Sequence, residues 1–154
     1  MDLILWRHAE AEELAEGGDD LVRPLTPRGE KHASRMAAWL DRQLPEGTRV
    51  LASPALRCEQ TAQRLGRKYK VLEGLAPGGT IEALLDAVHW PTARQPVVVV
   101  GHQPVLGQMV SHLLHITGGS CAVRKGSVWW LRTRERDGHE QTVVWAVLTP
   151  ELVA

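Results

Sequence analysis

Three short segments of this sequence each place arginine or histidine behind a run of apolar residues. The four side chains concerned are Arg7, His8, Arg57 and His102. The guanidinium group of arginine matches two phosphate oxygens at once, and a neutral imidazole can attack phosphorus and carry the phosphoryl group until water removes it. The other imidazole, if protonated, would hydrogen-bond a phosphoryl oxygen. Together these residues would form a phosphate site with a nucleophile inside it, and no metal ion is required.

The apolar runs predict the strands that bring these side chains together. Residues 3–6, 50–52 and 97–100 are apolar, and the last run, four valines in succession, is typical of a strand buried on both faces. Ligands of open α/β sheets bind at the carboxyl ends of the strands, where the polar clusters are expected. A helix that starts at Pro104 would also direct free backbone N–H groups, that of Gln103 among them, toward the same anion.

Helix signals separate these strands. Thr26-Pro27 predicts an N-cap followed by proline in the first turn, and apolar residues at helical spacing extend this helix to about Gln43. Ser53-Pro54 repeats the signal and predicts a helix toward Tyr69 with Ser53 as N-cap. Further helices are expected over 80–90 and from 104 to about 116.

The other segments complete a layered fold. We expect a surface loop over the acidic residues 9–23, a weak strand at 71–72, and a closing hairpin with strands 128–133 and 142–148. The alternation of strands and helices predicts an α/β fold, a three-layer α/β/α sandwich with a mostly parallel central sheet and an antiparallel edge. We expect a single domain over residues 1–154.

Composition excludes several classes of function. Eighteen basic and 18 acidic residues give a formal net charge of zero, whereas a general nucleic-acid or anionic-membrane binder carries a basic excess. No apolar run approaches a membrane span, and Asp2 and Arg7 do not fit a signal peptide, so we expect a cytoplasmic protein. Cys58 and Cys121 form no metal-binding pattern, and Cys58 is expected to be a small buried side chain.

Three segments together resemble the signatures of the histidine phosphatase superfamily, which has the phosphoglycerate-mutase-like fold. They are Arg7-His8-Ala9, Ser53-Pro54-Ala55-Leu56-Arg57-Cys58-Glu59-Gln60-Thr61-Ala62 and Gly101-His102. The resemblance implies His8 as the nucleophile, with Arg7, Arg57 and His102 completing the phosphate pocket. The short chain, the segment 23–29 and the turn 75–79 are similar to SixA-type phosphohistidine phosphatases. Larger relatives carry an insertion that lids the site, for which the stretch between 72 and 97 leaves little room.

Departures from the family pattern bear on the substrate. Ala9 replaces the usual glycine, Leu14 stands where mutase-like members have asparagine, and Gln103 replaces the aspartate that serves as general acid in acid phosphatases. Glu73, Glu82 and Asp86 remain as candidates for a general acid. The imidazole of phosphohistidine is a better leaving group than an alkoxide, so a site without a dedicated acid fits phosphohistidine.

We therefore expect a metal-independent and cofactor-free phosphohistidine phosphatase that acts on a phosphoprotein. The expected partner is a phosphotransfer domain or a phosphotransferase-system carrier. One alternative is a phosphatase for a small phosphate monoester with a mid-chain carboxylate as acid, and another is a non-catalytic phospho-ligand binding module. The sequence leaves open whether Arg23 points into the pocket and whether the loop from Glu10 to Asp20 contacts substrate. His112 and His115 share a helix face without a third metal ligand.

Overall fold

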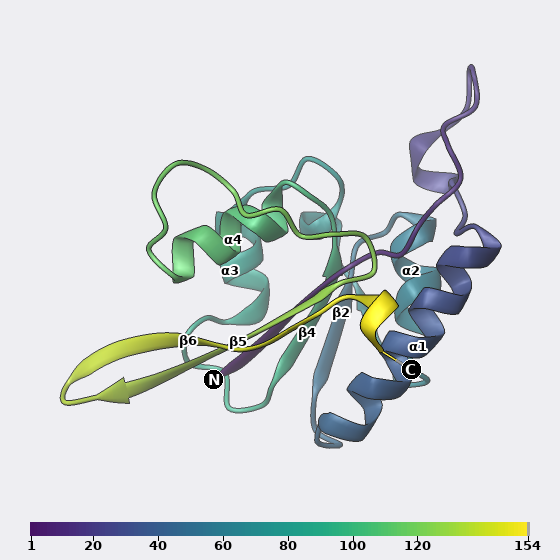
Figure 1. The fold of residues 1–154 in the computed structure, drawn as a ribbon. Coiled ribbons are helices and arrows are strands. Elements are labelled where there is room, and N and C mark those ends of the chain that lie inside the picture. Colours follow the sequence, from purple (N-terminus) through teal and green to yellow (C-terminus); the bar gives the residue numbers. More distant parts are fainter. Residues whose placement is uncertain (154) are drawn as a thin grey trace.

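A six-stranded sheet forms the centre of the computed structural model, which describes residues 1–153 (Figure 1). The strands are β1 Asp2–Arg7, β2 Arg49–Ala52, β3 Lys70–Val71, β4 Val97–Gly101, β5 Val128–Arg136 and β6 His139–Leu148. They lie in the order β3-β2-β4-β1-β5-β6. The first four pair in parallel, whereas β5 pairs antiparallel with both β1 and β6. The predicted mostly parallel sheet with an antiparallel edge is confirmed.

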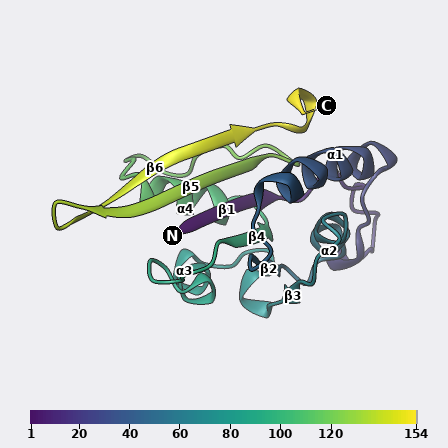
Figure 2. The same cartoon turned by 90° about the horizontal axis from the view of Figure 1, so that it is seen from below.

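Helices cover both faces of this sheet, as a three-layer sandwich requires. The helices are α1 Pro27–Gln43, α2 Leu56–Gln63, α3 Ile81–Val88 and α4 Val105–Leu113, with short 3-10 turns η1 Asp20–Val22, η2 Glu73–Leu75 and η3 Pro150–Leu152. Alternate side chains of a strand point to opposite faces. Ile4 and Trp6 of β1 accordingly pack with α1 and α2, and Leu3 and Leu5 pack with α3 and α4. Figure 2 shows the β5–β6 hairpin extending away from α1 and α2.

The first helix confirms the sequence prediction at both ends. The Thr26 side chain accepts a hydrogen bond from the backbone N–H of Gly29, and the helix ends at Gln43. Gly29 also permits a close approach, because a Cβ atom at this position would overlap the carbonyl oxygen of Glu10. The first turn of α1 therefore packs directly against the backbone that follows β1.

The second helix is shorter than predicted. It begins at Leu56, with Ala55 in the N-cap position, because the Ser53 hydroxyl accepts a hydrogen bond from the N–H of Ala55 and forms a local turn instead of a cap. The helix ends at Gln63, and Gly66 then takes the left-handed backbone conformation with φ of 70°. The predicted N-cap role of Ser53 and the extension to Tyr69 were wrong.

The remaining boundaries shift by a few residues. Helix α3 ends at Val88 because His89 is left-handed, and α4 runs from Val105 to Leu113, with Pro104 as its N-cap residue, instead of reaching 116. The weak strand β3 lies at 70–71. The closing hairpin is longer than predicted because Asp137 and Gly138, with φ of 52° and 78°, form a tight two-residue turn that lets both strands run up to it.

Candidate active site

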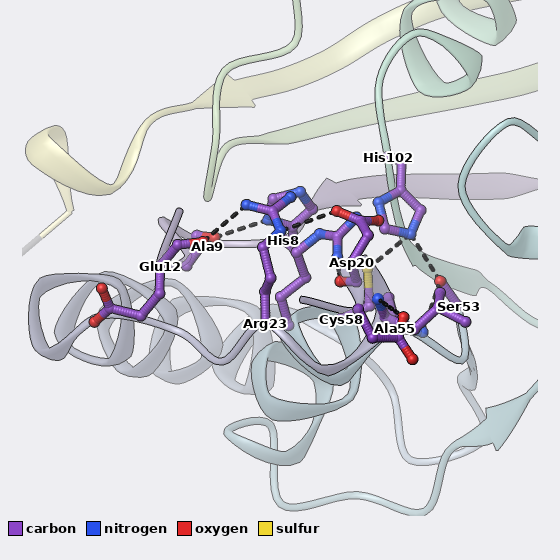
Figure 3. A network of polar contacts seen from close by, with 12 residues as sticks. His8, Ala9, Glu12, Asp20, Arg23, Ser53, Ala55, Cys58 and His102 are labelled. Atoms are coloured by element: carbon purple, nitrogen blue, oxygen red, sulfur yellow. Dashed lines mark hydrogen bonds and ion pairs between the residues drawn. The ribbon is translucent and has the colours of Figure 1, made fainter. Parts of the chain in front are cut away.

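The ends of neighbouring parallel strands bring the predicted polar clusters together. Arg7 is the register partner of Gly101, so His8 and His102 follow side by side. The backbone N–H of His8 donates to the carbonyl of Gly101 over 3.2 Å, and the N–H of Ser53 donates to that of Val100 over 3.0 Å. The two imidazole rings lie 5.4 Å apart between centroids, at an interplanar angle of 57° (Figure 3).

The imidazole of His8 is buried and held in one tautomer. Its Nδ1 lies 2.8 Å from the carbonyl oxygen of Ala9, and a carbonyl oxygen only accepts, so Nδ1 carries the proton and Nε2 keeps its lone pair. Burial lowers the pKa of His8 to about 3, and the charges of Arg57 and Arg7 act in the same direction. The ring is therefore neutral at pH 7 and presents a nucleophilic nitrogen.

His102 is buried beside polar partners from the second segment. Its Nε2 lies 2.7 Å from the Ser53 hydroxyl and 3.4 Å from the sulfur of Cys58. Burial, followed by the charge of Arg57, lowers the pKa of His102 to about 4. His102 is therefore neutral at pH 7 in these surroundings, and not the protonated imidazole considered from the sequence.

Both predicted arginines reach the same place and keep donors available. Arg57 is 3% exposed, and its charge and that of Arg7 both act on the two histidines. One Nη of Arg7 donates to the carbonyl of Val123 over 2.9 Å. In the part of the chain that the structure describes, the Nε atoms of both arginines are buried without a hydrogen-bond partner. Unpaired buried N–H groups are costly, and an oxyanion would satisfy them.

Asp20 is a residue of this site that sequence reasoning did not identify. It begins η1, and its carboxylate lies 3.1 Å from an Nη of Arg57 and 2.9 Å from the Nε of Arg23. Burial opposes ionisation of Asp20, but Arg57 and Arg23 outweigh it and lower the pKa. Arg23 also donates to the carbonyl of Glu12, so it lies at the rim of the pocket and is not merely solvated (Figure 3). The acidic loop carried no periodic pattern that would have singled out Asp20.

Two side chains of α2, Thr61 and Cys58, contact the residues of the pocket. The Thr61 hydroxyl accepts from the N–H of Ala9 over 3.2 Å and donates to the carbonyl of Arg57 over 2.8 Å. Cys58 is fully buried, and burial raises the pKa of its thiol to about 12. The prediction of a small buried side chain at Cys58 is confirmed, and its thiol stays protonated.

The side chain of Gln103 is engaged elsewhere. Its Nε2 donates to the carbonyl of Cys121 over 2.8 Å, and its Oε1 accepts from the N–H of Gly107 over 2.7 Å. Both polar ends are occupied in holding the 121 segment against α4. Only the backbone N–H of Gln103 is left for the predicted contact with an anion.

Two of the three mid-chain carboxylates, Glu73 and Asp86, line a different part of the surface from the pocket. Glu73 and Asp86 line a separate surface cavity of about 430 Å³, together with Arg49 and Lys70. Within residues 1–153, neither they nor Glu82 share a hydrogen bond or ion pair with the four pocket residues. Glu82, in the first turn of α3, therefore makes no polar contact with these four residues in the described part of the chain.

The remaining predictions concern metals and membranes. His112 and His115 line a cavity of about 350 Å³ with Trp90 and Glu140. Within residues 1–153 no three His, Cys, Asp or Glu side chains are grouped so that they could hold a metal ion. Among the helices of that same part of the chain, none combines the length and the apolar character that crossing a membrane requires.

Comparison with known proteins agrees with this geometry. The model of the histidine phosphatase superfamily (branch 1) matches residues 3–76. Phosphohistidine phosphatase SixA of Escherichia coli is 35% identical over 122 residues, which cover 73% of this chain and 74% of SixA. An uncharacterized protein of Picosynechococcus is 34% identical over 141 residues, or 86% of each chain.

The solved structures agree at the level of the whole fold. The structure of the protein histidine phosphatase SixA complexed with tungstate superposes with a TM-score of 0.81 at 28% identity, covering 97% of both chains. Shared sequence, shared fold and the converging strand ends thus point the same way. This chain belongs to branch 1 of the histidine phosphatase superfamily and is of the SixA type.

Proposed function

We propose that this phosphatase removes the phosphoryl group from a histidine side chain of another protein, through a transient phosphohistidine at His8. The observation that carries this proposal is the neutral, buried imidazole of His8, whose Nδ1 is fixed on the Ala9 carbonyl while two arginines and His102 surround it. A phosphatase of this family requires a phosphate cradle and a nucleophile in one place, and these residues supply both.

The chemistry follows from the positions of these groups. Nε2 of His8 attacks phosphorus in line, and the P–N bond of the substrate breaks as its imidazole takes a proton from water. Arg7 and Arg57 neutralise the phosphoryl oxygens with fixed positive charge, and His102 lies within reach as a further hydrogen-bond group. Water then attacks the phosphoryl group on His8, which releases inorganic phosphate and restores the neutral ring.

The surroundings of the pocket favour phosphohistidine over a phosphate ester. Asp20 contacts the pocket arginine Arg57, and its lowered pKa keeps it ionised at pH 7, where it cannot donate a proton. A leaving alkoxide needs such a donor, whereas a leaving imidazole does not depend on one. The relative named phosphohistidine phosphatase SixA supports the same substrate class.

The local architecture also favours a protein substrate. Between β3 and β4 the chain forms only η2 and α3, whose buried residues Leu75, Leu84 and Val88 pack on the sheet. No segment of the stretch 72–96 is available to form a separate domain over the site. An open pocket admits a phosphorylated side chain on a folded partner, such as a phosphotransfer domain or a phosphotransferase-system carrier.

Turnover of histidine-phosphorylated carrier protein by the wild type and by His8→Ala tests the proposal. The wild type should release phosphate and form an acid-labile phosphoenzyme, and His8→Ala should do neither. His139→Ala, at an exposed position in β6, is the matched control and should keep full activity. Retained turnover in His8→Ala would contradict the mechanism.

A panel of phosphate monoesters tests the substrate class. Phosphoserine and similar esters should react far more slowly than phosphohistidine. Fast ester hydrolysis that collapses in Glu82→Gln would instead favour the small-ester phosphatase. Stoichiometric binding of phosphate without turnover would favour a binding module.

A further inference from the structure

We propose that a basic cavity next to the pocket binds acidic side chains that flank the phosphohistidine of the partner protein. This proposal rests on the proposed function, because it names the chemistry of the partner that the same site would receive. The cavity has a volume of about 310 Å³ and is lined by Arg7, Glu10, Arg28, His32, Arg124, Lys125 and Glu151. Because Arg7 also belongs to the phosphate pocket, the two sites are contiguous.

The backbone beside Lys125 is held in a fixed position relative to the nucleophile. The backbone N–H of Gly126 donates to the carbonyls of Arg7 and His8, over 3.1 and 2.9 Å, and the N–H of Arg7 donates to the carbonyl of Ser127 over 3.1 Å. Lys125 directly precedes Gly126, whose N–H donates two of these hydrogen bonds. Because Lys125 lines the same cavity as Arg7, a partner that presents its phosphohistidine to His8 brings neighbouring residues toward Lys125.

The cavity keeps an excess of unpaired positive charge. Glu151 lies 3.3 Å from Arg124 and is paired with it, whereas Glu10 accepts a hydrogen bond over 2.7 Å from the Thr26 hydroxyl, a neutral partner that does not cancel a charge. Arg28 and Lys125 are exposed and form no ion pair within residues 1–153. With four cations against two carboxylates, the lining keeps a net excess of positive charge for anionic groups supplied from outside.

Helix stability does not explain why an arginine occupies position 28. It lies in the first turn of α1, where the positive end of the helix dipole disfavours a cation. At the same position it borders the basic cavity. A carboxylate from a partner would there meet both the guanidinium group and the helix end.

The charge of the whole chain narrows the class of partner. The formal net charge is zero, so the positive field is local and suits a few acidic side chains better than the continuous phosphate backbone of a nucleic acid. Exposed charges of this kind steer association and fix register at an interface, and their effect is screened by salt. We therefore infer that acidic residues adjacent to phosphohistidine distinguish good substrates from poor ones.

Two synthetic phosphohistidine peptides of equal length test this inference, one with aspartate and glutamate around the phosphohistidine and one with asparagine and glutamine. The wild type should show kcat/KM about fivefold higher for the acidic peptide at low salt, an effect of the size of two exposed ion pairs, and the preference should fade at high salt. The double variant Arg28→Ala/Lys125→Ala should lose the preference while turning over the neutral peptide normally.

Arg35→Ala is the matched control, since Arg35 is an exposed arginine of the same helix outside the cavity lining. It should keep the preference. Equal rates on both peptides with the wild type would overturn the docking proposal and leave the proposed function intact. Failure of the wild type to hydrolyse the histidine-phosphorylated carrier protein as well as both peptides would overturn both proposals. Slower turnover of the neutral peptide in the double variant would show a role in chemistry and would also overturn docking.

Discussion

Lowering the pH from 8 to 5 should destabilise this protein strongly, because His8 and His102 are buried in their neutral forms. Their pKa values in the folded protein are about 3 and about 4, below the ordinary value of 6.5. The unfolded chain therefore takes up protons first. The stabilisation is complete above pH 6.5 and is lost as the pH falls from 6.5 toward the folded-state values.

The size of the effect follows from these pKa values. At pH 5 each histidine lowers the free energy of unfolding by about 2 kcal/mol relative to pH 8, and the two together by about 4 kcal/mol. Small domains are stable by only about 5–15 kcal/mol in total, so this loss is a large fraction. Both rings are nearly inaccessible to solvent, at 6% and 3% exposure, so water does little to screen the effect.

Urea denaturation followed by tryptophan fluorescence, in buffers without phosphate, measures this dependence. His8→Asn and His102→Asn should each lose about half of the pH dependence between pH 8 and 5, whatever their stability at pH 8. His139→Asn, at an exposed position, should keep the wild-type dependence. Equal stability of the wild type at the two pH values, or an unchanged slope in His8→Asn, would refute the assignment of a buried neutral nucleophile.

Three further predictions concern the pocket and its supports. Asp20→Asn removes an anion that competes for Arg57, so calorimetry should show phosphate or tungstate binding about threefold more tightly; weaker binding would show that Asp20 assists the ligand instead. Gly29→Ala forces a Cβ atom against the Glu10 carbonyl oxygen, which should cost about 1–3 kcal/mol and lower both the melting temperature and the activity; an unchanged melting curve would contradict this close contact. Cys58 should resist iodoacetamide at pH 8 in the native protein, because burial raises the pKa of its thiol to about 12, and rapid labelling seen by mass spectrometry would oppose that.

The sequence was informative where local pattern and position in the sheet coincide. Arg7 ends a strand, and His8 and His102 each come directly after one. Because parallel strands carry the residues at their carboxyl ends to a common edge, the convergence of these side chains was predictable. The three layers were predictable from the alternation of strand and helix signals. Thr26 was identified as a cap because the hydrogen bond that its side chain accepts comes from Gly29, only three residues along the chain.

The missed features depend on partners that are distant in the chain. Asp20 lies in a loop without periodicity, and its place is decided by Arg57, 37 residues away. Ser53 has the residue type of an N-cap, but its hydroxyl is shared between the N–H of Ala55 and the ring of His102. The Gln103 side chain pairs with the Cys121 carbonyl, a contact that local sequence does not reveal.

The hydrogen bonds from the Gly126 N–H to the carbonyls of Arg7 and His8 fix the backbone of the nucleophile without using any side chain of the preceding residues. Substitutions that change the surface of this loop are thereby separated from substitutions that change the catalytic site. The residue types at 124 and 125 can vary while the register of the nucleophile stays the same, because the anchors are the backbone N–H of Gly126 and the backbone carbonyl of Val123. Substitutions at Arg124 and Lys125 would then redirect the enzyme to other partners without altering its chemistry.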